Sequence, residues 1–538
     1  MVRAIITERY IRRFSYHTVG SICRFHTMGA KPHVGVVGSG ISGLRCADIL
    51  IQNGARVTIL EARDRIGGRV HQNDLAGHLV DLGPNWIHGT GENPIMSIAE
   101  ATQTVAHDPE GRNISISCDG QLVNEERATK SAEFVWTTIE EAFEYSNQHG
   151  DSIPPERSLF DFIQEKLEKT NFSDEDKRLC LDSCKLWGAY VGDPIERQSL
   201  KFFRLEECID GNNYFVASTY QRILQHVAKT ALAQADIRFK QPVIKIETPP
   251  KDEQEPSRHQ VTVTTASGEI HTFDQLVITC PLGWLKRNTE SFNPQLPARF
   301  LQAINNISFG RLEKIFVKFP NAFWHSESES TQTTQANNAQ STNPVFAQFL
   351  EPTYTSHPKD IQWNQECLSL ANLPSPCAQP ILLFYTYGPC GTNIVNQIAD
   401  LDENSSEYKQ ILTDILKPFY SKLPGYDPSS PSCKPSSVLA TRWQLDPYAG
   451  NGSYCNFQVG LVAGDKDIEV LRSGDGIGAE RGIWFAGEHT APFVALGTTT
   501  GAYWSGERAA AQVCERVGLR SVGVGSSRDD SLPSAGRK

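Results

Sequence analysis

The sequence has 538 residues, and its 51 lysines and arginines against 62 aspartates and glutamates give a formal net charge of −11 at pH 7. This length exceeds one ordinary hydrophobic core and predicts two or three domains. With 39% hydrophobic and 21% charged residues, the composition is typical of a soluble globular protein. The acidic balance argues against a nucleic-acid partner, and without a run of 18 apolar residues no integral membrane segment is expected.

Residues 1–33 differ from the rest of the chain, because they hold six basic residues and a single acid, Glu8. Such a leader resembles a mitochondrial transit peptide, and a disordered extension or a true start at Met28 are open alternatives. The remaining chain has 45 basic and 61 acidic residues, a net charge of −16. Because the cysteines form no CxxC pairs and no signal peptide is visible, we expect an intracellular protein, cytoplasmic or mitochondrial, with reduced thiols and no metal.

The first predicted elements form a β-α-β unit. Residues 34–37 are a short apolar run, residues 41–50 have the apolar spacing of a helix, and residues 57–60 predict a second buried strand. A unit of about this length is expected to place its two strands in parallel with a right-handed connection.

The middle and the end of the chain predict further helices and strands. Residues 325–343 are polar and are predicted to be a disordered insertion, and residues 425–437 are rich in breakers and predict a loop or a domain crossing. Amphipathic spacing predicts helices at 158–169, 220–233 and 501–517, and alternating or apolar runs predict strands at 243–247, 261–264, 275–279, 312–319 and 482–487.

A glycine-rich motif, Gly38-Ser-Gly40-Ile-Ser42-Gly43, lies between the first strand and the first helix. Its glycines allow a tight turn, close approach of a phosphate, and close packing of helix and strand, and the helix N-terminus favours an anion. Glu61 ends the second strand, where a carboxylate can bind a ribose diol. This context predicts a dinucleotide site but does not separate NAD from FAD.

The residues that follow carry a resemblance. Glu61 is followed by Gly67-Gly68-Arg69, whose glycines bring the chain close to a cofactor and whose guanidinium can bind a phosphate or its surroundings. With this motif the chain resembles the flavin-containing amine oxidase family, which includes polyamine oxidases, monoamine oxidases and lysine-specific histone demethylases. The resemblance extends from about residue 34 to residue 517, in separate blocks.

By this resemblance the cofactor is FAD, and each block has a role. The block at 81–89 would pass under the flavin, the backbone of Val243 would contact the adenine side, Glu488 would hold the ribityl or pyrophosphate region, and the backbone near Thr499 would approach the pyrimidine end. The cofactor-binding residues are therefore predicted to be Gly38, Gly40, Ser42, Gly43, Glu61, Arg69, Gly83, Trp86, Val243, Glu488 and Thr499.

The resemblance also implies the fold: α/β and α+β, with a discontinuous Rossmann-like FAD-binding domain and an inserted substrate domain of mixed sheet and helices. FAD blocks lie at both ends of the chain, so the FAD-binding domain must be assembled from separate segments. We expect a leader at 1–33, the FAD-binding domain at 34–95, 220–311 and 441–518, the substrate domain at 96–219 and 312–440, and a disordered tail at 519–538.

The implied chemistry is oxidation of a small amine. Hydride passes from the α-carbon of the amine to flavin N5, the imine hydrolyses, and O₂ is reduced to H₂O₂. Lys314 is expected to hold a water near N5 and assist reoxidation, His88 to accept a proton from the substrate, and Trp443 to form an aromatic wall. For each of these three the alternative is a structural role: a solvated strand lysine, a packing histidine and a core tryptophan.

One departure leaves the substrate open. Many relatives carry an aromatic residue shortly before the final Gly-Ala, but here Phe493 lies further off and Leu496 or a threonine takes that place. Polyamines are the best-guess substrate, and an alkaloid-like or amino-acid-derived amine is the alternative. A histone demethylase is disfavoured because the chain lacks a long coiled-coil insertion and a helical N-terminal module. A flavin-binding protein without turnover stays open, and the sequence does not predict an oligomeric state.

Overall fold

The computed structural model describes residues 31–109, 111–249, 260–325, 343–357, 361 and 364–519. The first 30 residues of the predicted leader, most of the predicted insertion and all but the first residue of the predicted tail lie outside these ranges. The residues from Pro32 onward form one contact-dense unit. It is a mixed α/β fold with several sheets, as the sequence predicted, while the predicted domain boundaries stay a prediction.

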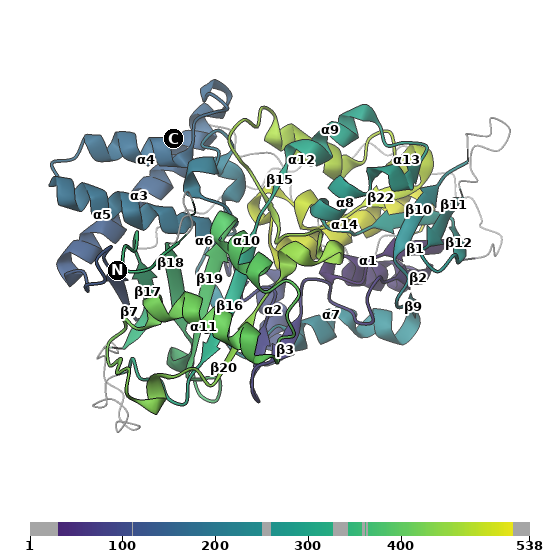
Figure 1. The fold of residues 1–538 in the computed structure, drawn as a ribbon. Helices are drawn as coiled ribbons and strands as arrows, with labels where there is room; N and C mark the ends of the chain where they lie inside the picture. The colour runs from purple at the N-terminus through teal and green to yellow at the C-terminus, as the bar shows by residue number, and fades with distance from the viewer. Residues whose placement is uncertain are drawn as a thin grey trace. The chain divides into compact units, whose positions relative to one another are not determined.

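A five-stranded parallel sheet joins the two ends of this unit (Figure 1). Every pairing within the sheet is parallel, so the connections must cross over, as a β-α-β unit requires. The edge strand β22 comes from the C-terminal part of the chain and pairs with β13, which in turn pairs with the first strand. The strand order is β22 (Ile483–Phe485), β13 (Gln275–Ile278), β1 (His33–Val37), β2 (Arg56–Leu60) and β9 (Asp236–Arg238).

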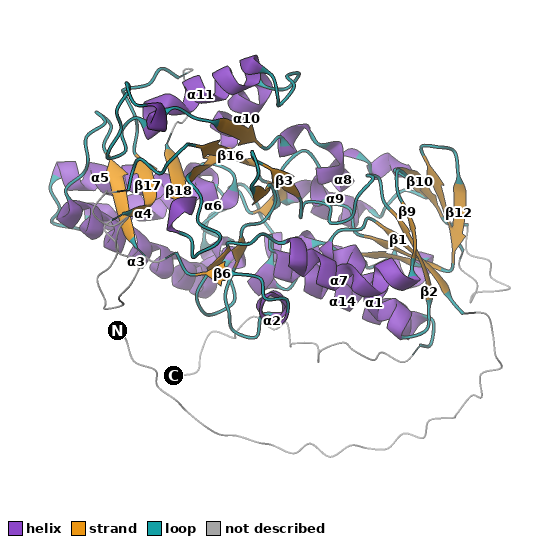
Figure 2. Cartoon of the chain, turned by 90° about the horizontal axis from the view of Figure 1, so that it is seen from below, coloured by secondary structure: helices purple, strands orange, loops and turns teal. Residues whose placement is uncertain are grey.

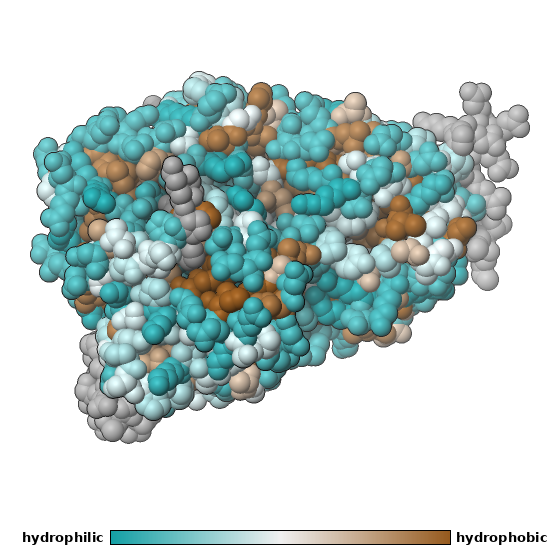
Figure 3. Space-filling view, viewed as in Figure 1, coloured by the Kyte–Doolittle hydropathy of each residue, from teal (hydrophilic) through white to brown (hydrophobic). Residues whose placement is uncertain are grey.

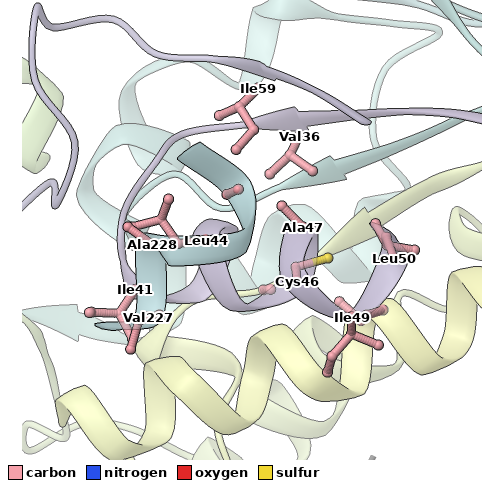
Figure 4. Close-up of a cluster of buried hydrophobic side chains, with 14 of the residues drawn as sticks. Val36, Ile41, Leu44, Cys46, Ala47, Ile49, Leu50, Ile59, Val227 and Ala228 are labelled. Carbon is pink, nitrogen blue, oxygen red and sulfur yellow. The ribbon is translucent and has the colours of Figure 1, made fainter. Parts of the chain in front are cut away.

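Three helices cover one face of the parallel sheet and lie side by side (Figure 2). They are α1 (Ile41–Gln52), α7 (Gln221–Gln234) and α14 (Thr499–Arg516). The close-up shows Val36 and Ile59 of the strands facing Leu44 and Ala47 of α1 (Figure 4). A helix from the end of the chain therefore shares one hydrophobic core with the first strand and the first helix.

The opposite face of the parallel sheet packs against a second core. Strands of a four-stranded sheet and several helices supply its apolar side chains. The strands are β12 (Ile270–Phe273), β11 (Val261–Thr265), β10 (Val243–Glu247) and β14 (Phe292–Asn293), and the helices are α8 (Leu282–Arg287), α9 (Ala298–Asn306) and α12 (Gly464–Ser473). Ile477, just before the short helix α13 (Gly478–Arg481), also belongs to this core.

A six-stranded mixed sheet forms the other half of the unit. Its order is β20 (Ser437–Ala440), β16 (Leu312–Lys318), β19 (Ile381–Tyr387), β18 (Gln365–Ser369), β17 (Pro344–Phe349) and β7 (Arg112–Ile116). Helices α10 (Gly388–Gln397) and α11 (Ser406–Tyr420) cover one face of this sheet. Its other face meets side chains from β4 (Leu79–Asp81), β5 (Trp86–Ile87) and β8 (Tyr214–Val216), so it faces the segment that follows the glycine-rich motif.

Helices and short strands complete the unit. Helix α3 packs along α4 and α5, and Ser158 caps α4 in a reciprocal capping box with Asp161. The helices are α2 (Pro94–Ala101), α3 (Glu125–His149), α4 (Leu159–Glu168), α5 (Asp174–Cys184) and α6 (Gly188–Val191), and the short strands are β3 (Gln72–Asp74), β6 (Ala106–His107), β15 (Ser308–Phe309) and β21 (Cys455–Asn456).

The surface is polar. On the face seen in Figure 1 most side chains are hydrophilic and the apolar ones gather in separate patches (Figure 3). Among the described residues, no helix combines the length and apolar character needed to span a membrane.

Candidate active site

The glycine-rich turn between β1 and α1 leaves open space at a helix N-terminus. Gly38 has φ +102°, and a Cβ on Gly43 would lie 2.1 Å from the carbonyl oxygen of Gly38, so neither position tolerates a side chain. A Cβ on Gly40 would meet nothing closer than 4.0 Å. Gly40 caps α1 without any side-chain hydrogen bond, so the first N–H groups of the helix remain for an anionic ligand.

Glu61 holds its carboxylate at the end of β2, beside this turn. It is 5% exposed, and its Oε2 accepts hydrogen bonds from Ser39 N at 2.8 Å and Ser39 Oγ at 2.6 Å. Its Oε1 accepts one from Arg63 N at 2.9 Å, and its backbone oxygen accepts one from Gln241 N, two residues before Val243. The predicted ribose carboxylate and the predicted adenine-side strand β10 therefore lie together.

An ion pair joins the first glycine-rich block to the last one. The Arg69 Nη1 donates to Glu488 Oε1 at 3.1 Å and to the Ser453 carbonyl at 2.5 Å. Glu488 is 4% exposed; burial would raise its pKa, but the charges of Arg69 and His489 and the hydrogen bonds from Cys455 and Arg69 together outweigh burial, and the pKa is lowered. A segment near the start of the chain and two segments more than 380 residues further on therefore meet at one charged centre.

The second helix N-terminus of the site belongs to α14. Thr498 caps it by accepting a hydrogen bond from Gly501 N at 3.0 Å, and Thr499 is its first residue. The side chain of Ser42 is 3.1 Å from Ser505 Oγ, a hydrogen bond that joins α1 to α14. The two helices that the resemblance assigns to the cofactor thus lie against each other.

These features fit FAD. The open space at Gly40, the uncapped N–H groups of α1, the buried carboxylate of Glu61 and the charged pair Arg69–Glu488 are the donors, acceptors and clearance that an anionic dinucleotide requires.

Lys314 lies on β16 with its ammonium group pointing at the loop after β4. It is 6% exposed, and its Nζ donates to the Gly83 carbonyl and, at 3.4 Å, to the Asp81 carbonyl. Burial lowers the pKa of Lys314, and the Asp81 charge opposes this. A Cβ on Gly83 would lie 1.9 Å from the Arg69 carbonyl oxygen, so this loop, the lysine and the Gly-Gly-Arg segment are packed closely.

Trp443 is fixed by hydrogen bonds from both its indole ring and its backbone. Its Nε1 donates to the Leu82 carbonyl at 3.1 Å, and its backbone N donates to Glu313 Oε2 at 3.1 Å. Glu313 is 2% exposed and also accepts from Thr441 Oγ1 and Gln444 N. Glu313 was not predicted as a site residue from the sequence. It is a carboxylate next to Lys314 in a predicted strand, and neighbouring residues of a strand face opposite sides of the sheet, which could have indicated a buried acid behind the lysine.

Trp86 lies on the same side of the six-stranded sheet as Lys314, and His88 follows it two residues along the chain. Trp86 Nε1 donates to Tyr385 Oη at 3.1 Å and its ring stacks on Phe346 with centroids 6.4 Å apart. Burial lowers the pKa of His88, and a hydrogen bond that the imidazole donates to Asn213 opposes this, so His88 is disposed to be neutral. Among the described residues, His88 shares no hydrogen bond with Lys314 or Trp443.

Of the aromatic residues near the end of the chain, Phe493 lies in a hydrophobic core and Tyr454 lies near the candidate site. Phe493 is 8% exposed and belongs to the core on the far face of the parallel sheet, beneath the Arg472 guanidinium at 4.8 Å. Leu496 packs at the edge of the same core. Tyr454 instead lies beside Gly497, because a Cβ on Gly497 would be 3.3 Å from the tyrosine ring. Tyr454 therefore places an aromatic ring next to the segment before Gly501-Ala502, in which the sequence shows no aromatic residue at the expected position.

The fold and the site fit a protein that binds an anionic dinucleotide at the N-terminal end of α1. Comparison with known families identifies it further: the family model described as flavin containing amine oxidoreductase matches residues 41–514, and the chain belongs to this family. The resemblance stated from the sequence is confirmed, and the protein is an FAD-dependent amine oxidase.

Curated relatives agree with the family. The chain is 27% identical to probable polyamine oxidase 4 of Arabidopsis thaliana, over 92% of this chain and 89% of that protein. It is 26% identical to the human peroxisomal N(1)-acetyl-spermine/spermidine oxidase, over 89% of this chain and 94% of that protein. It is also 25% identical to protein FLOWERING LOCUS D of Arabidopsis thaliana, over 95% of this chain but 58% of that protein.

Proposed function

We propose that the protein oxidises polyamines at a site bounded by Lys314, Trp443 and Trp86. The observation that carries this proposal is the buried lysine, whose Nζ is bonded to the loop that runs from β4 to Trp86. The relatives named as polyamine oxidases, which match nearly the whole chain, support the substrate class.

Residues from three segments would hold the cofactor. We infer that the N–H groups after Gly40 bind the pyrophosphate, Glu61 the adenosine ribose, and Glu488 with Arg69 the ribityl side. The FAD-binding domain would then consist of residues 34–95, 220–311 and 441–518, with the backbone of Val243 on the adenine side and Thr499 at the pyrimidine end. The parallel sheet and its three helices support this division.

The chain's own groups would prepare the amine. When bound, FAD accepts a hydride from the α-carbon of the amine and passes the electrons to O₂, which yields H₂O₂. His88, whose lowered pKa keeps it neutral, accepts a proton from the incoming ammonium. Trp443, fixed by Leu82 and Glu313, forms one wall of the site, and Lys314 holds a water on the other side.

A substrate panel tests the proposal. The purified protein is mixed without O₂ with spermine, spermidine, N-acetylspermine, a monoamine and amino acids, and loss of the oxidised flavin absorbance is followed. We expect the polyamines to reduce the flavin fastest and to release H₂O₂ in air. Faster reduction by an alkaloid-like or amino-acid-derived amine would replace the substrate class, and no reduction by any amine would refute the function.

A further inference from the structure

Asp81 is a buried acid at the end of β4, next to the lysine of the candidate active site. It is 2% exposed, and its carbonyl oxygen lies 3.4 Å from the Lys314 Nζ. In the part of the chain that the structure describes, its carboxylate forms no ion pair with a basic side chain. The carboxylate is therefore close to the ammonium group of Lys314 without contacting it.

Two neighbouring elements hold this carboxylate in place. The backbone N–H of Tyr220, at the start of α7, donates to Asp81 Oδ2 at 2.9 Å and to Oδ1 at 3.2 Å. Gln72 Nε2, on the paired strand β3, donates to Oδ1 at 2.6 Å. Hydrogen bonds to a carboxylate, and the N-terminus of a helix, favour its ionised form. The negative charge is thus fixed between β3, β4 and α7.

The same bonds fix the loop that receives Lys314. The carbonyl oxygens of Asp81 and Gly83 accept hydrogen bonds from the Lys314 Nζ. Asp81 starts this loop, and Trp86 follows its end, where the Trp86 carbonyl accepts a hydrogen bond from the Tyr220 hydroxyl at 2.6 Å. Tyr220 therefore holds both ends of the loop, one through its backbone and the other through its hydroxyl.

Asp81 and Lys314 also act on each other by charge. Burial raises the pKa of Asp81, and the hydrogen bond from Gln72, the Lys314 charge and the bond from Tyr220 oppose this. Burial lowers the pKa of Lys314, and the Asp81 charge opposes this. Because buried charges are screened weakly, they interact without being in contact. Each of the two groups therefore favours the charged form of the other.

Two tyrosines face this pair. Tyr385 lies opposite Lys314 on β19, with its ring centroid 6.0 Å from the Nζ, and Tyr220 contacts Asp81 as described. Burial raises the pKa of both tyrosines, so both are neutral at physiological pH. Neither tyrosine adds a charge to the pair.

The charged residues on the neighbouring segments have partners elsewhere. Glu313 points to the other face of the sheet, and Arg69 forms an ion pair with Glu488. Lys318, further along β16, donates to a surface carbonyl. The negative charge that acts on the buried lysine is therefore that of Asp81.

We infer that Asp81 is a positioning residue for Lys314: its carboxylate fixes the loop that binds the ammonium group and supplies the negative charge that keeps a proton on it. This inference rests on the proposed function for its consequence in catalysis. Reduction of O₂ to H₂O₂ consumes two electrons and two protons. Both electrons and one proton come from the reduced cofactor, and Lys314 can give the other proton, which it regains from water, only while it is protonated.

NMR follows the proton on Lys314 directly. The protein is loaded with oxidised FAD and labelled with ¹³C at the lysine Cε, and the Lys314 signal is the one that Lys314→Met lacks. Asp81→Asn keeps the shape of the side chain and removes its charge, so we expect the midpoint of the Lys314 titration to move at least about one pH unit toward acid. Asp81→Glu, which keeps the charge, should move it less than half as far.

Asp74→Asn is the matched control. Asp74 is an exposed acid on β3, the strand that pairs with β4. Its substitution should leave the Lys314 titration unchanged. A shift as large as in Asp81→Asn would show that the effect is not specific to the buried carboxylate and would overturn the inference.

A second variant covers the case in which Asp81→Asn does not fold. Gln72→Leu, at a partly exposed position, removes one hydrogen bond that stabilises the ionised carboxylate. Asp81 then ionises less readily, so we expect the Lys314 titration to move in the same direction by a smaller amount. An unmoved Lys314 titration in every one of these variants that folds would overturn the inference.

Reaction with O₂ separates the inference from the proposed function. The enzyme is reduced with dithionite, so no amine is needed, and is mixed with O₂ across a range of pH. We expect the rate to fall as pH rises through the Lys314 titration, and in Asp81→Asn to be about tenfold lower above the midpoint. If the NMR titration moves as expected and this rate does not follow it, the inference about Asp81 stands and the proposed role of Lys314 fails.

Discussion

Lys314 owes its position to the strand that carries it. Strand β16 lies between β20 and β19, and its residues 313–317 are buried on both faces, so the lysine reaches backbone carbonyls instead of water. Its lowered pKa follows from this burial. The group can therefore exchange a proton near neutral pH, which an exposed lysine does not.

Replacing Lys314 tests its role in reoxidation. In Lys314→Met we expect the reaction of the reduced enzyme with O₂ to slow by about 10²-fold, because a positioned proton donor and its water are lost. Stopped-flow mixing of reduced enzyme with O₂ measures this rate. Lys318→Met, on the same strand and face, is the control and should react normally. Unchanged rates in both variants would assign Lys314 a structural role.

His489 makes stability depend on pH. Burial lowers its pKa to about 4; Glu488 opposes this, while Arg69, Arg508 and Lys286 add to it. Between pH 6.5 and 4 the unfolded state binds a proton that the folded state does not, so stability falls as pH falls through this range. From pH 7 to pH 5 the loss due to this residue is about 2 kcal/mol.

Urea unfolding at the two pH values checks this. His489→Leu should lose about 2 kcal/mol less than the wild type on going from pH 7 to pH 5, and the exposed His226→Gln should lose as much as the wild type. An equal loss in His489→Leu would mean that the imidazole is protonated in the folded protein.

Some site residues could be predicted from sequence and others could not. Gly38, Gly43 and Glu61 could, because their chemistry depends on neighbours within 30 residues along the chain. Glu313 could not, because its partners Thr441, Trp443 and Gln444 follow β20, and neither β16 nor β20 shows in its own sequence that the two strands pair.

Among the helices and strands, the spacing of apolar residues predicted the bounds correctly where one face of the element is buried and the other exposed. Helix α4, with its capping box, and strand β10 have the predicted bounds to within a residue. Helix α3 was missed, because its 25 residues are mostly polar and only five are buried. Strand β19 was missed as well; all seven of its residues are buried, so it lacks the alternation that marks a half-exposed strand.

The crossing of α1 and α14 requires glycine. A Cβ on Gly506 would lie 2.3 Å from the Ser42 carbonyl oxygen, so Gly506→Val must push the two helices apart. We expect loss of FAD together with a loss of more than about 2 kcal/mol of folding free energy, from overpacking. Flavin absorbance per protein and thermal unfolding measure both quantities.

Gly40→Ala is the matched variant at the N-cap of α1, close to Ser42. Its Cβ meets nothing within 4.0 Å and the φ of −73° suits alanine, so the apoprotein should unfold as the wild type does. The added methyl group lies where the cofactor is expected, so FAD should bind at least about tenfold more weakly. Normal FAD affinity in this variant would contradict the assignment of Gly40.

At the scale of the whole molecule, charge should affect the rate of encounter. The chain carries a net charge of −11, and polyamines are polycations at neutral pH. We expect kcat/KM for spermine to fall several-fold between 20 and 500 mM salt, roughly in proportion to substrate charge, while kcat stays constant. Steady-state kinetics with spermine and a monoamine measure this, and equal salt dependence for both substrates would exclude steering.

The place of β22 at the edge of the first sheet has a consequence for synthesis of the protein. Strand β1 leaves the ribosome about 450 residues before β22, which at 5–20 residues per second is roughly 20 to 90 s. During that time the partly made sheet exposes the unpaired edge of β13 and the apolar face that α14 later covers. We therefore expect newly made chains to associate unless they are protected until α14 is made, and chains terminated before α14 to bind no FAD.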